Sequence, residues 1–194
     1  GVAWQDAAMS TPSSHDRSAR AHVHLTGDQH SVTTLELFFD LVFVFAVTQV
    51  TVLTAHHLDA AGVARSTVLF WLIWRAWTQF TWTLSPADTQ HTVVRATTLV
   101  ATGAAFVMAA SVPRAFEDDP MWFAVPYVLI RLLGLAVQVK IDHERAGEGQ
   151  GISMAWVYVS LIGLAVVLVG ATVAMPGRTW VWLGAIAVDF LAAA

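Results

Sequence analysis

The 194-residue sequence contains no cysteine and only one lysine, and charged residues make up 12% of it. The lack of cysteine excludes disulfides, thiolate metal sites and thiol catalysis. A soluble domain would be roughly a quarter charged, so the low content argues against a water-exposed globule. The net charge of −4 offers no basic surface, and we expect no nucleic-acid partner. The one lysine, Lys140, lies at a predicted helix end, so this stretch has no buried lysine for a retinal-type cofactor.

Long apolar runs dominate instead. Hydrophobic residues make up 56% of the sequence, and charged residues gather in short stretches between the runs. A run of about 20 apolar residues crosses a bilayer as a helix, because the backbone in lipid must satisfy its own hydrogen bonds. Short connections make consecutive helices antiparallel neighbours. The sequence therefore predicts an all-α, polytopic transmembrane helical bundle in a lipid bilayer, with about six helices: 34–55, 63–84, 92–112, 121–138, 153–175 and 179–194.

The two ends of the sequence differ from this pattern. Residues 1–33 are polar and poor in aliphatic side chains, which predicts a disordered aqueous tail ahead of a transmembrane domain at 34–194. No basic stretch leads into a short apolar core with a cleavage site, so the tail does not read as a signal peptide. The first residue is Gly and the sequence stops inside an apolar run. We therefore expect the chain to be the first part of a longer protein, truncated at its C-terminal end.

The arrangement of arginine and lysine predicts an orientation, because positive residues in short loops favour the cytoplasmic side. The N-terminal side would hold Arg17, Arg20, Arg95, Lys140 and Arg145. The opposite side would hold Arg65, Arg114 and Arg178. The sequence thus predicts a multi-pass protein of the inner (cell) membrane with a cytoplasmic N-terminus.

Small residues recur on two of the predicted helices. Ala101, Ala105 and Ala109 follow a four-residue spacing, and Gly163, Gly170 and Ala174 fall on one side of the fifth run. Such faces let the backbones of neighbouring membrane helices approach closely. We expect both to be helix-packing surfaces.

Five ionisable residues fall inside the predicted spans: Glu36, Asp40, Arg75, Arg131 and Asp189. A charge within lipid costs at least about 2.5 kcal/mol, so each of them needs a partner or a function. Glu36 lies close enough to the end of its span to reach the interface, and it shares a helix face with Asp40. Asp189 lies in the last, incomplete run, and its partner could lie in sequence beyond it.

Depth suggests which of these charges could meet. At about 1.5 Å per residue, Asp40 lies roughly 9–10 Å from the N-terminal side, Arg131 about 10 Å and Arg75 roughly 14 Å. We therefore expect Asp40 to pair with Arg131 first and with Arg75 second, since a paired buried charge costs much less than a lone one. Arg75 also has Trp71 and Gln79 one turn away, which could hold it without an acid.

Other patterns give no further site. The histidines of the tail and of the first loop lack helical spacing or a supporting carboxylate, so no metal site is predicted. The glycine-rich stretch "GEGQG" (147–151) follows no strand and precedes no Gly-Lys-Ser, so it predicts a connector rather than a phosphate loop. We expect no catalytic constellation and no cofactor.

The stretch "ELFFDLVFVFAVTQ" (36–49) resembles the hallmark of the bacterial low-temperature-requirement A family, integral membrane proteins named for a growth phenotype. The similarity continues more loosely through "TWTLSPADT", "SVPRAF" and "YVLIRLL", and covers about residues 33–194. The family's second signature, a Glu-Arg followed by a glycine-rich apolar stretch, is absent and would follow this chain. The resemblance carries over Glu36 and Asp40, and more loosely Arg131. It implies a membrane location and a helical architecture, but no named activity.

Two functional hypotheses remain open, with a weaker third. The charges could serve a transporter or an ion/proton-coupled permease, with Asp40 as the charge or proton carrier, Glu36 at its entrance, and a small ion or a proton as partner. Alternatively, the charges only fix helix packing in a non-catalytic structural or sensory protein that supports growth at low temperature. A membrane enzyme or cofactor binder would need site residues from sequence beyond this chain.

Overall fold

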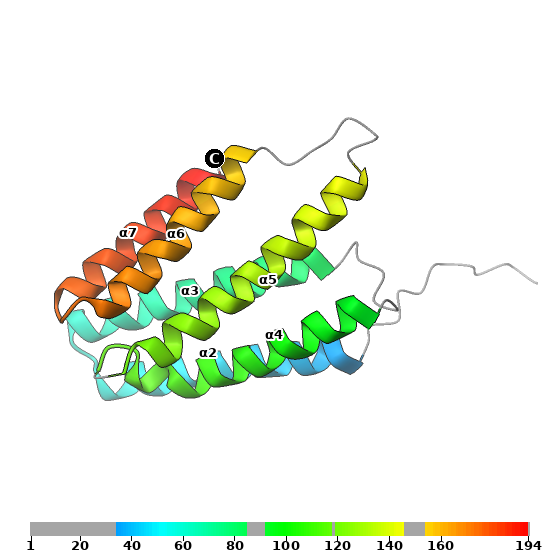
Figure 1. Cartoon of the computed structure of the whole chain (residues 1–194). Coiled ribbons are helices and arrows are strands. Elements are labelled where there is room, and N and C mark those ends of the chain that lie inside the picture. Colours follow the sequence, from blue (N-terminus) through cyan, green and yellow to red (C-terminus); the bar gives the residue numbers. More distant parts are fainter. Residues whose placement is uncertain (1–33, 85–91, 118, 146–153, 194) are drawn as a thin grey trace, which may run out of the picture. The chain divides into compact units, whose positions relative to one another are not determined.

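The computed structural model describes residues 34–84, 92–117, 119–145 and 154–193, and within them the chain forms α-helices, one short 3₁₀ turn and no strand (Figure 1). This confirms the all-α prediction of about six helices. The predicted polar tail at 1–33 lies outside the described residues. The elements are α2 Thr34–His56, α3 Ala60–Leu84, α4 Thr92–Ser111, η1 Val112–Arg114, α5 Met121–Arg145, α6 Met154–Thr172 and α7 Gly177–Ala193.

Four of these helices are long and apolar enough to cross a bilayer: Leu37–His56, Arg95–Arg114, Met121–His143 and Met154–Thr172. The other two, α3 and α7, do not reach the same measure. Helix α7 is 17 residues long, and α3 interrupts its apolar residues with Arg65, Arg75 and Gln79. Arg75 of α3 and Asp189 of α7 form an ion pair, so the charged residues of these two helices lie at the contact between them.

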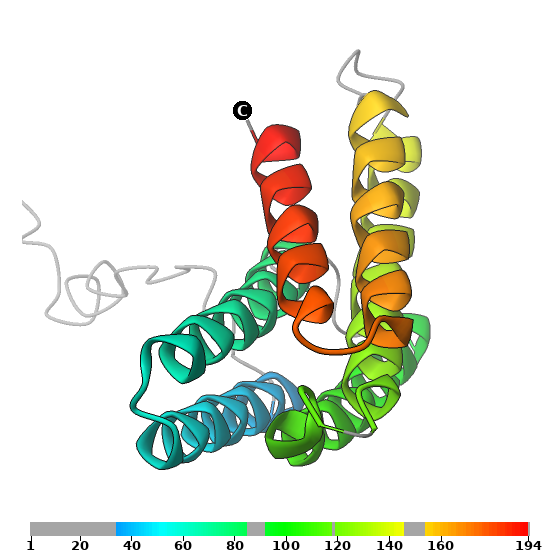
Figure 2. The same cartoon turned by 90° about the vertical axis from the view of Figure 1, so that its left-hand side faces the viewer.

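The helix contacts form a closed circuit. Helix α2 contacts α3 and α4, α4 contacts α5, α5 contacts α6, α6 contacts α7, and α7 returns to α3. Helix α5 also contacts α3 across this circuit. Figure 2 shows the same order, with α6 and α7 beside each other and α2 next to both α3 and α4.

The largest difference between predicted and observed bounds is at α5. Its apolar run was expected to end at residue 138, but the helix continues to Arg145 through the polar segment "KIDHER". Hydropathy marks where the lipid-compatible stretch ends, whereas a helix ends only where its backbone hydrogen bonds stop. Residues on α5 therefore lie farther from its C-terminal end than the apolar run suggests.

Aromatic side chains and small residues fill the space between the helices. Phe39 lies with its ring centroid 4.9 Å from that of Phe43 and 4.6 Å from that of Phe80, which joins α2 to α3. On α4, Ala101, Ala105 and Ala109 are each fully buried. Their burial confirms that the alanine spacing marks a packing face.

Helices α6 and α7 pack closely through Gly163 and Gly170, both buried. The indole Nε1 of Trp182 donates a hydrogen bond to the backbone carbonyl of Val167, at 3.0 Å. The prediction was wrong for Ala174, which lies beyond the end of α6 and is exposed. The turn between the two helices begins before Ala174, so that residue has no facing helix.

Replacing Gly170 with Ala should destabilise the protein by about 1–3 kcal/mol. A Cβ at Gly170 would lie 2.5 Å from Cδ1 of Trp182, so the α6–α7 contact would have to open. The matched control is Gly184→Ala on α7, where a Cβ meets nothing within 4 Å. That variant should be neutral or more stable, because Ala favours helix over Gly. Unfolding in detergent micelles measures both, and equal effects would contradict the close approach.

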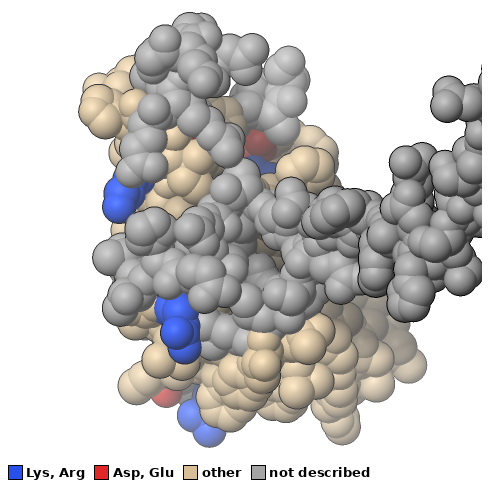
Figure 3. All heavy atoms as spheres, turned by 90° about the vertical axis from the view of Figure 1, so that its right-hand side faces the viewer, with Lys and Arg blue, Asp and Glu red and all other residues tan. Residues whose placement is uncertain are grey.

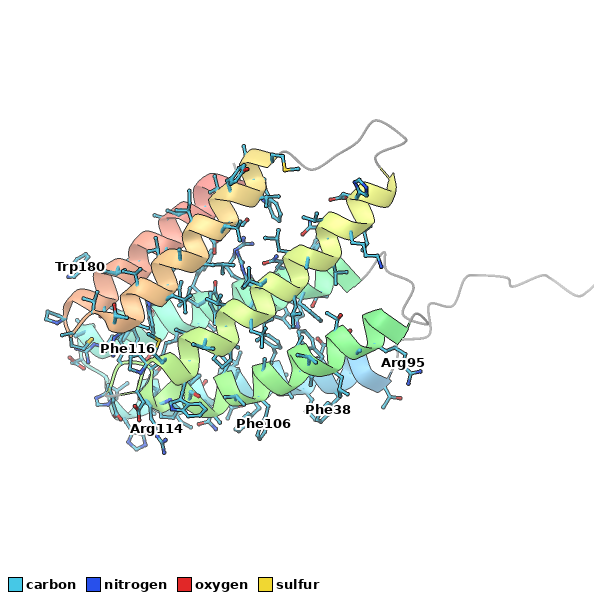
Figure 4. All side chains as sticks on the ribbon, viewed as in Figure 1. Phe38, Arg95, Phe106, Arg114, Phe116 and Trp180 are labelled. Atoms are coloured by element: carbon cyan, nitrogen blue, oxygen red, sulfur yellow. The ribbon has the colours of Figure 1, made fainter. Side chains whose placement is uncertain are left out.

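The outer surface is apolar. Phe38 on α2 and Phe106 on α4 are 52% and 56% exposed (Figure 4), although the ring of Phe106 also stacks on Phe45 of α2. Figure 3 shows one end of the molecule, where the described surface is mostly uncharged and Lys and Arg form separate small patches. Large apolar side chains on the outside are expected where lipid, rather than water, surrounds the helices.

Candidate functional site

Three of the charges predicted to lie within the membrane meet in one buried cluster. Nη2 of Arg131, on α5, donates a hydrogen bond to Oδ1 of Asp189, on α7, at 2.9 Å. Nε of Arg75, on α3, lies 3.5 Å from Oδ2 of the same carboxylate. Arg131 and Asp189 are only 2% and 5% exposed. Asp189 thus bridges two arginines and joins three helices.

The prediction that Asp40 pairs with Arg131 or Arg75 is wrong, because both arginines pair with Asp189. Because α5 continues to residue 145, Arg131 lies 14 residues from that end, or about 21 Å rather than 10 Å. Measured from the opposite end, Arg131 lies 10 residues into α5 and Asp189 lies 12 residues into α7, about 15 Å and 18 Å. The depths of this pair match, whereas that of Asp40 does not.

Arg75 misses Asp40 for a different reason, its direction on α3. Arg75 contacts Asp189 of α7, whereas Trp77, two residues later, contacts Asp40 of α2. Two residues of an α-helix are about 200° apart, so these side chains leave nearly opposite sides of α3. Helix α2 therefore lies on the Trp77 side and α7 on the Arg75 side.

The residues around the cluster hold its helices together. Gln79 donates a hydrogen bond from Nε2 to the backbone carbonyl of Arg131, at 3.3 Å. Trp71 stacks on Phe190, with ring centroids 4.7 Å apart. The sequence had suggested that Trp71 and Gln79 could hold Arg75 without an acid. In the structure Trp71 contacts Phe190 of α7, and Gln79 contacts the backbone of α5. On α6, the lack of a side chain at Gly163 leaves room beside Asp189, since a Cβ would lie 3.8 Å from Oδ1.

The cluster contains two positive charges and one negative charge. Nε and Nη1 of Arg131 are buried and have no hydrogen-bond partner among the described residues. Nε of Arg75 has its ion pair with Asp189 but no well-directed hydrogen bond. If one of the helices moved away, a buried ion pair would break and leave an uncompensated charge, which is costly. The ion pairs therefore hold α3, α5 and α7 in one arrangement.

Asp40 forms a second, separate site. Its Oδ1 accepts a hydrogen bond from Nε1 of Trp77, at 2.8 Å, and the residue is otherwise exposed. It lines a cavity of about 570 Å³ between α2 and α3. The lining residues are Asp40, Phe43, Val44, Val47, Thr48, Thr51, Phe70, Ile73, Trp74 and Trp77.

The cavity combines one charged group with apolar walls. Among the described residues, Asp40 is the only ionisable one in its lining. The hydroxyls of Thr48 and Thr51 donate hydrogen bonds back to the carbonyls of Val44 and Val47, each at 3.0 Å. From Asp40 to Thr51 the cavity follows 11 residues of α2, about 16 Å. It is therefore an elongated apolar groove with a carboxylate at one end.

Several candidate residues remain outside these two sites or were missed. Glu36 lies on α2, but its side chain is not among those described. No group of three or more His, Cys, Asp or Glu that could hold a metal occurs in the described part of the chain. Tyr127 is fully buried one turn before Arg131 and is close enough to interact electrostatically with all three cluster charges. Its i, i+4 spacing could have predicted this, whereas nothing in the sequence singled out Trp77 among the tryptophans of α3.

Apolar helices, a lipid-compatible surface and charges buried between helices define a multi-pass helical membrane protein. The chain belongs to the bacterial low temperature requirement A (LtrA) family, whose model matches residues 31–194. It is also 37% identical over 101 residues to an uncharacterised protein of Rhizobium meliloti (strain 1021). That match covers 52% of this chain but 24% of the relative's length. No solved structure matches the chain.

Proposed function

We propose that the protein is a proton- or ion-coupled permease in which Asp40 carries the proton or charge. The observation that supports this is the position of Asp40. It lies within a predicted span and faces a cavity, and its one hydrogen bond among the described residues comes from the neutral indole of Trp77. The ion pairs of Asp189 with two arginines explain that carboxylate as part of the helix packing. Asp40 has no such arginine among the described residues, so packing does not explain it in the same way. Ionisable groups kept within a membrane are functional candidates by default.

The local geometry suits a group that changes charge. A carboxylate can accept the indole hydrogen bond, and a protonated carboxyl retains one acceptor oxygen for the same donor. Trp77 can therefore hold the side chain in both states. In this proposal Glu36, one turn nearer the start of α2, stands at the entrance to the site.

The distribution of exposed cations supports an inner-membrane protein with a cytoplasmic N-terminus, which is part of the proposal. Arg95 and Arg114 lie at opposite ends of the helices (Figure 4). Lys140 is exposed on the last turns of α5, which end at the same side as the start of α4. On the opposite side, Arg178 is buried and donates hydrogen bonds to the carbonyls of Ala115 and Glu117. Among the described residues, the exposed Lys and Arg side chains are Arg95 and Lys140 on the first side and Arg114 on the opposite side, where Arg65 is partly buried.

Neutralising Asp40 tests the proposal. In proteoliposomes with a pH gradient, Asp40→Asn should lower the protein-dependent proton flux by about tenfold or more, because a carboxamide cannot exchange a proton at this position. Asp119→Asn, at an exposed position before α5, is the matched control and should keep the flux. Wild-type flux in a stably folded Asp40→Asn protein would overturn the role of Asp40.

A structural or sensory role in growth at low temperature is the second candidate, and the Arg75–Asp189–Arg131 cluster favours it. That cluster uses three of the five intramembrane charges to join α3, α5 and α7 without any transport step. If this role is correct, the wild-type protein shows no flux above that of empty liposomes, and Asp40→Asn alters only stability.

A further inference from the structure

We infer that the α2–α3 cavity binds a lipophilic organic cation, with the positive centre beside Asp40 and the hydrocarbon body along the groove. This inference rests on the proposed role of Asp40 as a carrier and names the class of its substrate.

The size and lining of the cavity fit such a ligand. Its volume of about 570 Å³ lies within the range of roughly 300–1,000 Å³ typical of small-molecule sites. Seven of the ten lining residues are Phe, Val, Ile or Trp. A ligand with an apolar body would bury this surface, and its length would follow the groove from Asp40 toward Thr51.

The sign of the ligand's charge follows from the lining. Asp40 supplies the one charge among the described lining residues, and Trp77, its hydrogen-bond partner, has its ring centroid 5.3 Å from that of Trp74, which also lines the cavity. Indole faces attract cations, most strongly where water is excluded. The arginine of α3 nearest in sequence, Arg75, is engaged with Asp189 on the other side of the helix. An anion would find no cation in this lining.

An organic cation suits the cavity better than a bare metal ion. Hard metal cations require several oxygen ligands, commonly six or more. The lining provides one carboxylate, and the two threonine hydroxyls are hydrogen-bonded to their own helix. A cation with a hydrocarbon shell needs only charge neutralisation and apolar contact, and both are present.

The same carboxylate cannot hold a proton and neutralise a cation at once. Protonation removes the negative charge, so a bound cation leaves as a proton arrives, and one proton exchanges for one monovalent cation. On α2 itself the nearest other charged residue is Glu36, whose side chain is not among those described. The charged side chains on elements that contact α2 are Arg65 and Arg75 of α3, Arg95 of α4 and Arg114 of η1. None of these four arginines lines the cavity. Removing the negative charge of Asp40 should therefore weaken cation binding.

Binding of radiolabelled tetraphenylphosphonium to the full chain in phosphatidylcholine nanodiscs tests the inference. We expect saturable binding above that of empty nanodiscs, weakened at least about tenfold by Asp40→Asn and by about threefold in Trp74→Leu. Tetraphenylborate, an anion of the same shape, should not compete. Trp122→Phe, at an exposed position on α5 away from the cavity, is the matched control and should bind as the wild type does.

The outcomes separate the alternatives. Equal binding of the cation by the wild type and a folded Asp40→Asn protein, or equal competition by the anion, would overturn the inference. A phospholipid that copurifies with the wild type and is lost from Asp40→Asn in native mass spectrometry would also overturn it, since the occupant would then be a lipid headgroup. Thermal unfolding shows whether each variant is folded.

The flux measurement distinguishes this inference from the proposed function. Cation binding without any proton flux would leave the binding site standing and remove the permease. Asp40-dependent proton flux without cation binding would keep the permease and overturn the substrate class. Proton flux stimulated by tetraphenylphosphonium in the wild type alone supports both.

Discussion

Replacing Asp189 with Asn should lower the free energy of unfolding by about 3 kcal/mol, one of the two largest effects expected of a single substitution in this chain. Asp189 pairs with two arginines at once, through contacts of 2.9 Å and 3.5 Å, and is 5% exposed. Its loss would leave Arg75 and Arg131 facing each other without a counter-charge. Two like charges between apolar helices repel, and each loses its partner.

Charge counting predicts that the three members of the cluster are not equivalent. Arg75→Gln leaves a neutral Arg131–Asp189 pair, and Arg75 is 23% exposed, so it should cost less than about 1 kcal/mol. Arg131→Gln removes the shorter, fully buried contact and should cost more than Arg75→Gln but less than Asp189→Asn.

Thermal or denaturant unfolding in detergent, with a double-mutant cycle between Arg131 and Asp189, measures these differences. The double variant Arg131→Gln/Asp189→Asn should be more stable than Asp189→Asn alone, because it removes one of the two uncompensated arginines. If the two single effects simply add, or if Arg75→Gln is the most harmful variant, Asp189 is not the shared counter-charge of the two arginines.

Replacing Trp182 with Ala should destabilise the protein by about 3–5 kcal/mol, the usual range for a large aromatic residue removed from a core. Trp182 is fully buried, its ring centroid lies 5.1 Å from that of Phe116 and 5.7 Å from that of Phe123, and its indole is hydrogen-bonded to Val167. It thus joins α6 and α7 to the start of α5. The substitution removes this aromatic contact and leaves a cavity between the helices.

The neighbouring Trp180 provides the control for this variant. It lies on the same helix and is 73% exposed, pointing outward in Figure 4. Trp180→Ala should change the unfolding free energy by no more than about 0.5 kcal/mol. Intermediate loss for Trp182→Phe would separate the indole hydrogen bond from ring packing, since Phe keeps an aromatic ring without the N–H. Equal losses for the alanine variants at 180 and 182 would contradict the packing described for α7.

The charged residues show where sequence reasoning succeeded and where it failed. Counting residues identified Arg75, Arg131 and Asp189 as groups within the spans, and all three meet in the structure. The pairing of Asp40 with Arg131 failed because α5 continues for seven residues past its apolar run. An apolar run records which residues can face lipid, but depth depends on where the helix begins and ends.

The cavity at Asp40 could not be predicted in the same way. Its walls come from two helices whose facing sides depend on how each is rotated about its axis. Trp77 is one of four tryptophans on α3, and only its position opposite Asp40 distinguishes it. The small-residue face of α4 was easier to predict: Ala101, Ala105 and Ala109 are all buried, because a row of small side chains favours close helix packing.

The sequence by itself determined the helical class, the approximate bounds of the six helices, the membrane setting and the family, because these follow from local sums over residues and from one contiguous motif. Only the tertiary structure decided which acid neutralises the arginines and which one faces a cavity. Asp40 and Asp189 have the same side chain and both lie in apolar helices. Their roles differ because α7 packs on the Arg75 side of α3 and α2 on the opposite side, and a charge within lipid is held by whatever lies next to it.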